Sequence, residues 1–121
     1  MDLPSPTLKV PLKDLLYKPT KILRRYNFTG FFLVYNTVSG SYHLGTAKNI
    51  GIKLVSEFNL LKIGKHDLID LQQDFDDSYQ SIKVLVLNMS SNPSFLRDKA
   101  QITHTESLLK AKLHLKQQYS Q

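Results

Sequence analysis

The chain lacks cysteine and tryptophan, and its 121 residues include only two methionines and five glycines. Without cysteine there is no disulfide framework, no thiolate metal site and no cysteine nucleophile. No apolar run approaches the ~18 residues that a membrane-spanning helix needs. The N-terminal residues also lack the apolar segment of a secretory signal. We therefore expect an intracellular protein that does not associate with membranes.

Acidic residues are scarce at both ends of the chain. Residues 1–27 carry six Lys/Arg against two Asp, residues 28–89 carry five against six, and residues 90–121 carry five against two. A basic terminal segment is the usual electrostatic footprint of a polyanionic partner, although it also suits a solvated surface. We expect nucleic-acid binding, with these candidate residues: Lys18, Lys21, Arg24, Arg25, Lys48, Lys53, Arg97 and Lys99.

The length predicts a single domain with one core. We interpret residues 1–27 as a basic, proline-containing N-terminal extension. The segment contains four prolines, and each proline lacks a backbone N–H donor. One short helical turn is expected within it, around Leu12–Tyr17. Residues 28–121 are expected to form the domain proper. Deleting the extension should then weaken nucleic-acid binding far more than folding.

Hydrophobic periodicity predicts an α/β fold of the α+β type, a small three-stranded antiparallel sheet flanked by helices. Strands are expected over residues 28–36, 41–46 and 82–87, the first two joined by a turn at Ser39-Gly40, where glycine accepts a positive φ. The third strand has no polar alternation, so both of its faces should be covered. Helices are expected over residues 47–61 and 66–79. Gly51 inside the first helix predicts a close packing contact.

The last third of the sequence carries helix signals. Asn92-Pro93 can cap a helix with proline at its first position, and Thr103 with Glu106 has the spacing of a capping box. Five aspartates between residues 67 and 77 are expected on a solvated helix face, since they lack the spacing of a calcium loop. Four aromatic residues of the hairpin offer surfaces for base stacking, but strand alternation turns half of them toward the core: Phe31, Phe32, Tyr35 and Tyr42.

The hairpin followed by a helix resembles the GIY-YIG nuclease domain. Gly30-Phe31-Phe32 stands where that family has Gly-Ile-Tyr, His43-Leu44-Gly45 stands at its Tyr-Ile-Gly, and Lys53 stands at its helix arginine. The resemblance covers about residues 27–121. It implies a site in which two tyrosines and the arginine surround the scissile phosphate, while a glutamate on a later helix binds a divalent metal.

Every one of these catalytic positions is altered or ambiguous in this chain. Phe32 has no hydroxyl, His43 can act as a base near neutral pH, and Lys53 keeps the charge of arginine without its bidentate fork. Glu106 is the acidic residue available on the last helix, where it serves either as a metal ligand or as the capping-box partner. Lys112 is the other occupant of that position. The site is therefore expected to be degenerate, with no metal and no cofactor.

The first hypothesis is a non-catalytic nucleic-acid-binding protein, RNA being the expected partner, built on a degenerate GIY-YIG fold. It would be a structural component of a ribonucleoprotein such as a mitochondrial ribosome, in contact with ribosomal or other ribonucleoprotein components. The alternative is an active GIY-YIG DNA endonuclease of the homing or repair type, which would require Mg²⁺. A third hypothesis is a protein-interaction module. Salt-dependent nucleic-acid binding separates the first two from the third, and cleavage separates the second from the first.

Overall fold

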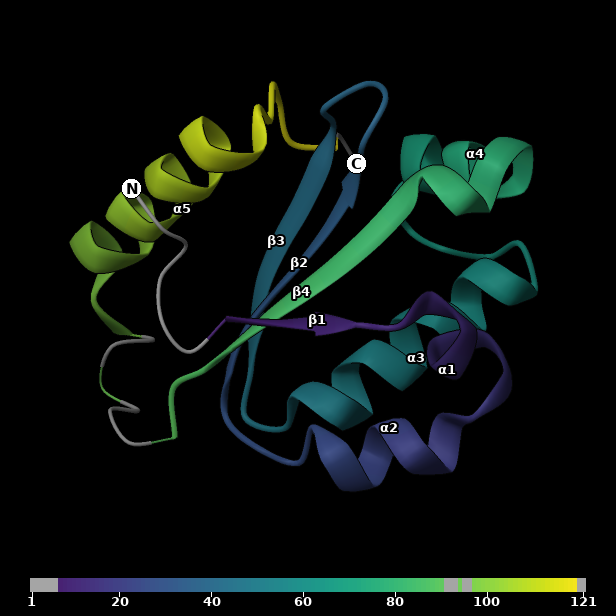
Figure 1. Cartoon of the computed structure of the whole chain (residues 1–121), viewed down its shortest axis with the longest axis horizontal. Helices are drawn as coiled ribbons and strands as arrows, with labels where there is room; N and C mark the ends of the chain where they lie inside the picture. The colour runs from purple at the N-terminus through teal and green to yellow at the C-terminus, as the bar shows by residue number, and fades with distance from the viewer. Residues whose placement is uncertain (1–6, 91–93, 95–96, 120–121) are drawn as a thin grey trace.

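The computed structural model describes residues 7–90, 94 and 97–119. These residues form an α+β fold with a four-stranded antiparallel sheet, in the order β1-β4-β2-β3, and five α-helices (Figure 1). The strands are β1 (Thr7–Val10), β2 (Gly30–Asn36), β3 (Tyr42–Ala47) and β4 (Ile82–Asn88). The helices are α1 (Leu12–Tyr17), α2 (Pro19–Arg25), α3 (Ile50–Lys62), α4 (Ile69–Ser78) and α5 (Lys99–Leu113), with a short 3₁₀ turn at Tyr79–Ser81.

The predicted hairpin of β2 and β3 is confirmed. Gly40 has a φ of 79° and donates its N–H to the Asn36 carbonyl at 2.9 Å. The buried Asn36 side chain holds the turn, since its Oδ1 accepts the N–H groups of Val38 and Ser39 at 2.8 and 3.1 Å. Local turn chemistry therefore fixes the register, in which Tyr35 pairs with Tyr42.

The prediction of three strands is wrong, because β1 adds a fourth. It pairs antiparallel with β4, with Val10 opposite Val84, and forms one edge of the sheet. Pro6 and Pro11 flank this strand in the sequence. Proline is tolerated at the ends of an edge strand, where the missing donor disrupts no ladder. Pro11, which directly follows Val10, thus marks the end of the strand.

The expectation that residues 1–27 stand outside the core is also wrong for the described part of that segment. Leu15, Ile22 and Tyr26 are at most 3% exposed, and they join the main hydrophobic core. Pro11 is the N-cap of α1 and Pro19 opens α2. Proline suits the first positions of a helix, where no intrahelical N–H bond is lost. This segment is therefore folded into the domain.

α3 begins one turn later than predicted, after Asn49, whose Oδ1 accepts the Ile52 N–H at 3.0 Å. The close contact predicted for Gly51 is confirmed. Its N–H donates to the Tyr26 carbonyl at 2.8 Å, and a Cβ at this position would lie 2.9 Å from the Ile22 carbonyl oxygen. Glycine therefore lets α3 lie directly against α2.

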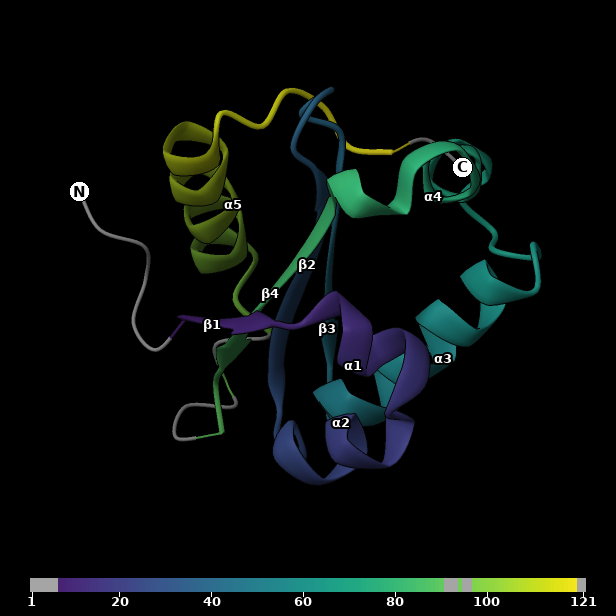
Figure 2. The ribbon, with the colours of Figure 1, turned by 45° about the vertical axis from the view of Figure 1, so that its right-hand side comes forward.

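Helices cover both faces of the sheet, as the apolar sequence of β4 predicted. One face packs against α1, α2, α3 and α4, and we call it the α3 face; α5 lies on the other, the α5 face (Figures 1 and 2). Alternation along β2 places Phe32 and Val34 on the α3 face and Leu33 on the α5 face. No helix among the described residues is long and apolar enough to cross a bilayer.

The C-terminal helix differs from its prediction. α5 begins after Asp98, whose Oδ1 accepts the N–H groups of Ala100 and Gln101 at 3.0 and 3.2 Å. Thr103 and Glu106 therefore lie inside the helix, and the predicted capping box is wrong. The carboxylate of Asp98, five residues before Thr103, supplies the cap. The predicted start at Asn92-Pro93 lies outside the described residues.

Candidate functional site

The sheet and α3 bring four ionisable side chains together on the α3 face: His43, Lys53, Glu57 and His66. We call them the Glu57 cluster. His43 comes from β3, Lys53 and Glu57 lie one turn apart on α3, and His66 precedes α4. The Phe32 ring on β2 meets the His43 ring edge-on, with centroids 5.4 Å apart. Three of the positions selected by the sequence, Phe32, His43 and Lys53, thus lie in one place.

Glu57 is the centre of this cluster and is only 8% exposed. Its Oε1 lies 3.6 Å from His43 Nε2 and 3.4 Å from Lys53 Nζ, while its Oε2 contacts His66 Nε2. Burial alone would raise the pKa of Glu57, but the hydrogen bonds and charges of His43 and His66 outweigh it and hold the pKa well below its usual range. The cluster therefore contains a buried, ionised carboxylate.

His66 is fixed by its neighbours. Its Nδ1 accepts the Leu68 N–H at 3.0 Å, so the neutral ring carries its proton on Nε2 and donates it to Glu57. The His66 N–H donates to Gln72 Oε1 at 3.0 Å, and Gln72 Nε2 donates to the Leu61 carbonyl at 2.9 Å. This tautomer leaves Nε2 without a free lone pair. No group of three His, Cys, Asp or Glu suited to a metal ion occurs among the described residues.

His43 and Lys53 are the more exposed members, with side chains 26% and 46% exposed. Both are directed to Glu57, whose negative charge opposes the approach of a phosphate. Phe32 is buried and has no proton to transfer. The cluster therefore connects β3, α3 and the segment before α4, and its lysine is already paired with Glu57.

Glu106 lies on the other side of the sheet. It accepts a hydrogen bond from the Tyr42 hydroxyl at 2.9 Å and another from the Gln118 side chain. Because Tyr42 and His43 are neighbours on one strand, their side chains point to opposite faces. The pKa of Tyr42 is raised to about 12. Burial of the hydroxyl is the larger cause, and its hydrogen bond to Glu106 is the next. Glu106 therefore anchors α5 and the C-terminal segment and does not reach the Glu57 cluster.

Four of the predicted nucleic-acid-binding residues gather on α2 and the residue before it. Lys18, Lys21, Arg24 and Arg25 line one open hollow together with Tyr17, which is 72% exposed. We call these five residues the α2 basic surface. Lys21 forms an ion pair with Asp14 at 3.3 Å. Within the described residues the other three cations have no ion-pair partner, so their charge faces solvent.

The other four predicted cations lie elsewhere. Lys48 precedes the Asn49 cap of α3, and its carbonyl accepts the Thr29 hydroxyl at 2.9 Å. Lys53 belongs to the Glu57 cluster. Arg97 and Lys99 lie at the start of α5, across the sheet from α2 (Figure 2). The eight residues therefore do not form a single surface.

Tyr17, the aromatic residue of the α2 basic surface, was not among the residues predicted from the sequence. Of the four hairpin aromatics, Phe31, Phe32 and Tyr42 are at most 2% exposed, and so cannot stack on bases. Tyr17 could have been found from its place next to Lys18, directly after the buried Leu15 and Leu16. That position at the end of a short amphipathic helix turns its ring outward.

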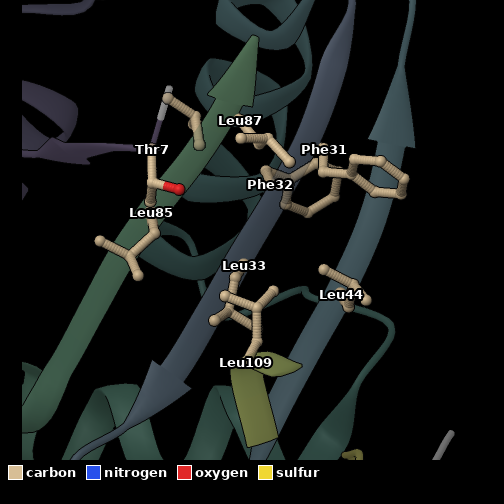
Figure 3. A pocket seen from close by; sticks show the side chains of 9 residues that line it. Thr7, Phe31, Phe32, Leu33, Leu44, Leu85, Leu87 and Leu109 are labelled. Carbon is tan, nitrogen blue, oxygen red and sulfur yellow. The ribbon is translucent and has the colours of Figure 1, made fainter. Parts of the chain in front are cut away.

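A small cavity on the α5 face is a weaker candidate. Figure 3 shows its lining, which is apolar except for the Thr7 hydroxyl and includes Phe31, Leu33, Leu85 and Leu109. Ligand sites combine apolar walls with several placed polar groups. This cavity lacks such a set among the residues that line it, and we interpret it as a gap in the packing of α5 on the sheet.

Comparison of the chain with protein-family models, with curated proteins and with solved structures gave no match.

Proposed function

We propose that this protein binds RNA through the α2 basic surface without cutting it. The observation that carries the proposal is the exposed Tyr17 ring in a hollow with Lys18, Arg24 and Arg25. Cations neutralise the phosphate backbone, while an exposed aromatic ring stacks on an unpaired base. An intracellular ribonucleoprotein, such as a mitochondrial ribosome, is the setting in which a small binding protein of this kind would act.

We also propose that the domain derives from the GIY-YIG nuclease fold. In support, β2 lies between β3 and β4, the hairpin leads directly into α3, and Phe32, His43 and Lys53 lie together. Loss of cleavage is supported by the missing hydroxyl at Phe32 and by the neutralisation of Lys53 by Glu57. It is further supported by the position of Glu106 across the sheet.

RNA binding is tested by titrating a fluorescently labelled single-stranded 12-mer at several salt concentrations. Each base stacked on an aromatic ring contributes ~1–3 kcal/mol, so Tyr17→Ala should weaken binding about 5- to 160-fold. Arg24→Ala/Arg25→Ala should lower the slope of log K against log salt by about 1.4, at about 0.7 per phosphate contact. Lys83→Ala/Lys112→Ala removes two exposed cations elsewhere and should bind like the wild type. Unchanged RNA binding by both variants of the α2 basic surface would refute the proposal.

One contact favours the alternative, a metal-dependent nuclease. Glu57 lies beside His43, and a carboxylate partner orients an imidazole for general-base catalysis. We expect no cleavage of RNA or DNA with Mg²⁺ or Mn²⁺. We also expect His43→Ala to leave RNA affinity within threefold, about 0.6 kcal/mol. Cleavage that His43→Ala abolishes would establish the nuclease instead.

A further inference from the structure

α3 carries a second apolar stripe on the side opposite its core contacts. Ile52 and Ile63 are 59% and 64% exposed, and Val55 lies half-buried between them. Leu23 of α2, 40% exposed, borders the same open groove. We call it the α2–α3 groove, and its full lining is Leu23, Ile52, Val55, Ser56, Asn59, Leu60 and Ile63.

The two exposed members of this stripe, Ile52 and Ile63, lie outside the main hydrophobic core, while Val55 packs partly against it. α3 already buries Ile50, Leu54 and Phe58 completely against the sheet. A helix that is apolar on two sides is typical of one that is covered on both. An uncharged groove spanning three turns of an otherwise amphipathic helix therefore indicates a docking surface.

The charges around the groove select its occupant. None of its lining residues is charged, while Lys53 and Lys62 flank the α3 stripe on its two sides and Arg24 follows Leu23. Lys62 also reaches the Leu16 carbonyl at 2.9 Å. The one acidic residue of α3, Glu57, is buried in the cluster, and α2 has none. The groove is thus an apolar strip bordered by cations.

We propose that the α2–α3 groove binds an amphipathic helix of a partner protein, one with an apolar face bordered by Asp or Glu. Its apolar side chains would cover Ile52, Val55 and Ile63, and its carboxylates would meet Lys62, since Lys53 is already paired with Glu57. A second copy of this chain is a poorer occupant, because it would bring the same cations together across the contact. The groove shares no lining residue with the α2 basic surface, and Arg24 of that surface borders it.

The test uses a designed 18-residue helical peptide with leucines at i, i+3, i+4 and i+7 and glutamates on both borders. A second peptide has lysine in place of each glutamate, and a third is a scrambled sequence of the glutamate peptide. Measured by fluorescence anisotropy, the glutamate peptide should bind the wild-type protein at least tenfold more tightly than the lysine peptide or the scrambled peptide does. The double substitution Ile52→Ser/Ile63→Ser should weaken binding of the glutamate peptide at least tenfold. The control Val38→Ser removes an apolar side chain that is 80% exposed on the hairpin turn and should change nothing.

The RNA titration separates this inference from the proposed function, since Ile52→Ser/Ile63→Ser should bind RNA like the wild type. Equal binding of the glutamate and scrambled peptides, or binding that the double substitution leaves unchanged, would overturn the proposal. So would sedimentation showing a wild-type dimer that Ile52→Ser/Ile63→Ser dissociates, which would assign the groove to a second copy. Binding to phosphatidylserine vesicles that the same variant loses would assign it to a lipid surface.

Discussion

The Phe32 ring occupies the space that a side chain at Gly45 would need. The two residues are paired across β2 and β3, and a Cβ on Gly45 would overlap the Cζ of the ring. Gly45 does not have the positive φ found at Gly40 and Gly64. Glycine is therefore required here by the neighbouring side chain, and not by a positive φ.

Gly45→Val is expected to cost ~1–3 kcal/mol of unfolding free energy, the usual range for overpacking. If the Phe32 ring is the cause, a smaller side chain at that position should relieve part of the cost. Chemical denaturation of Gly45→Val, Phe32→Leu and the double variant forms a double-mutant cycle. The double variant should lose less than the two single losses together. Strict additivity would show that the ring is not responsible.

Gly51→Ala should destabilise the protein, although alanine is the better helix former. In an exposed helix this change gains about 1 kcal/mol. Here the new methyl group would lie 2.9 Å from the Ile22 carbonyl and force α2 away, at a cost of ~1–3 kcal/mol. Ser56→Ala on the exposed side of α3 is the matched control and should be neutral or slightly stabilising. Thermal unfolding of both variants decides the sign, and a rise in Tm for Gly51→Ala would contradict the observed packing.

The parts of the fold that the sequence predicted are those set by local signals. The turn at Gly40 and the apolar alternation of β2 are encoded within a few residues. β1 could not be found in this way, because four residues between prolines become a strand only by pairing with β4 some 75 residues later, as in Val10 opposite Val84. Likewise, the buried side of α2 depends on α3 being close enough to cover Ile22.

The candidate sites show the same limit. Phe32, His43 and Lys53, which were selected from the sequence, lie close together in the structure, but Glu57 and His66 were missed. Glu57 did carry a signal, since it lies one turn after Lys53 and next to the buried Phe58 in the sequence. His66 has none, because its place beside Glu57 depends on how the chain turns between α3 and α4. Residues that contact each other only through the tertiary fold show no regular spacing in the sequence by which they could be predicted.

Glu57→Gln should destabilise the protein at neutral pH by about 1.5–3 kcal/mol, as for hydrogen bonds to a charged group. The pKa of Glu57 is lower in the folded than in the unfolded protein, so the unfolded state binds more protons as the pH falls. The contribution of the carboxylate is therefore fully present above its ordinary pKa of about 4.5 and is lost progressively below it. Urea unfolding from pH 7 to pH 3 should show the two proteins converging in stability as the pH drops. A difference independent of pH would contradict an ionised Glu57.

Deleting residues 1–27 should abolish folding, in contrast to the expectation from composition. The deletion removes β1, α1 and α2, and with them buried side chains such as Leu15, Ile22 and Tyr26. At ~1.5–3 kcal/mol for each fully buried apolar side chain, their loss approaches or exceeds the ~5–15 kcal/mol that stabilises a typical domain. Arg24→Ala/Arg25→Ala is the control, because it removes charge from the same segment without touching the core. Circular dichroism should show a cooperative thermal transition for the control variant and none for the deletion variant. A deletion variant that still unfolds cooperatively near the wild-type Tm would mean that the sheet and α3 are stable without this segment.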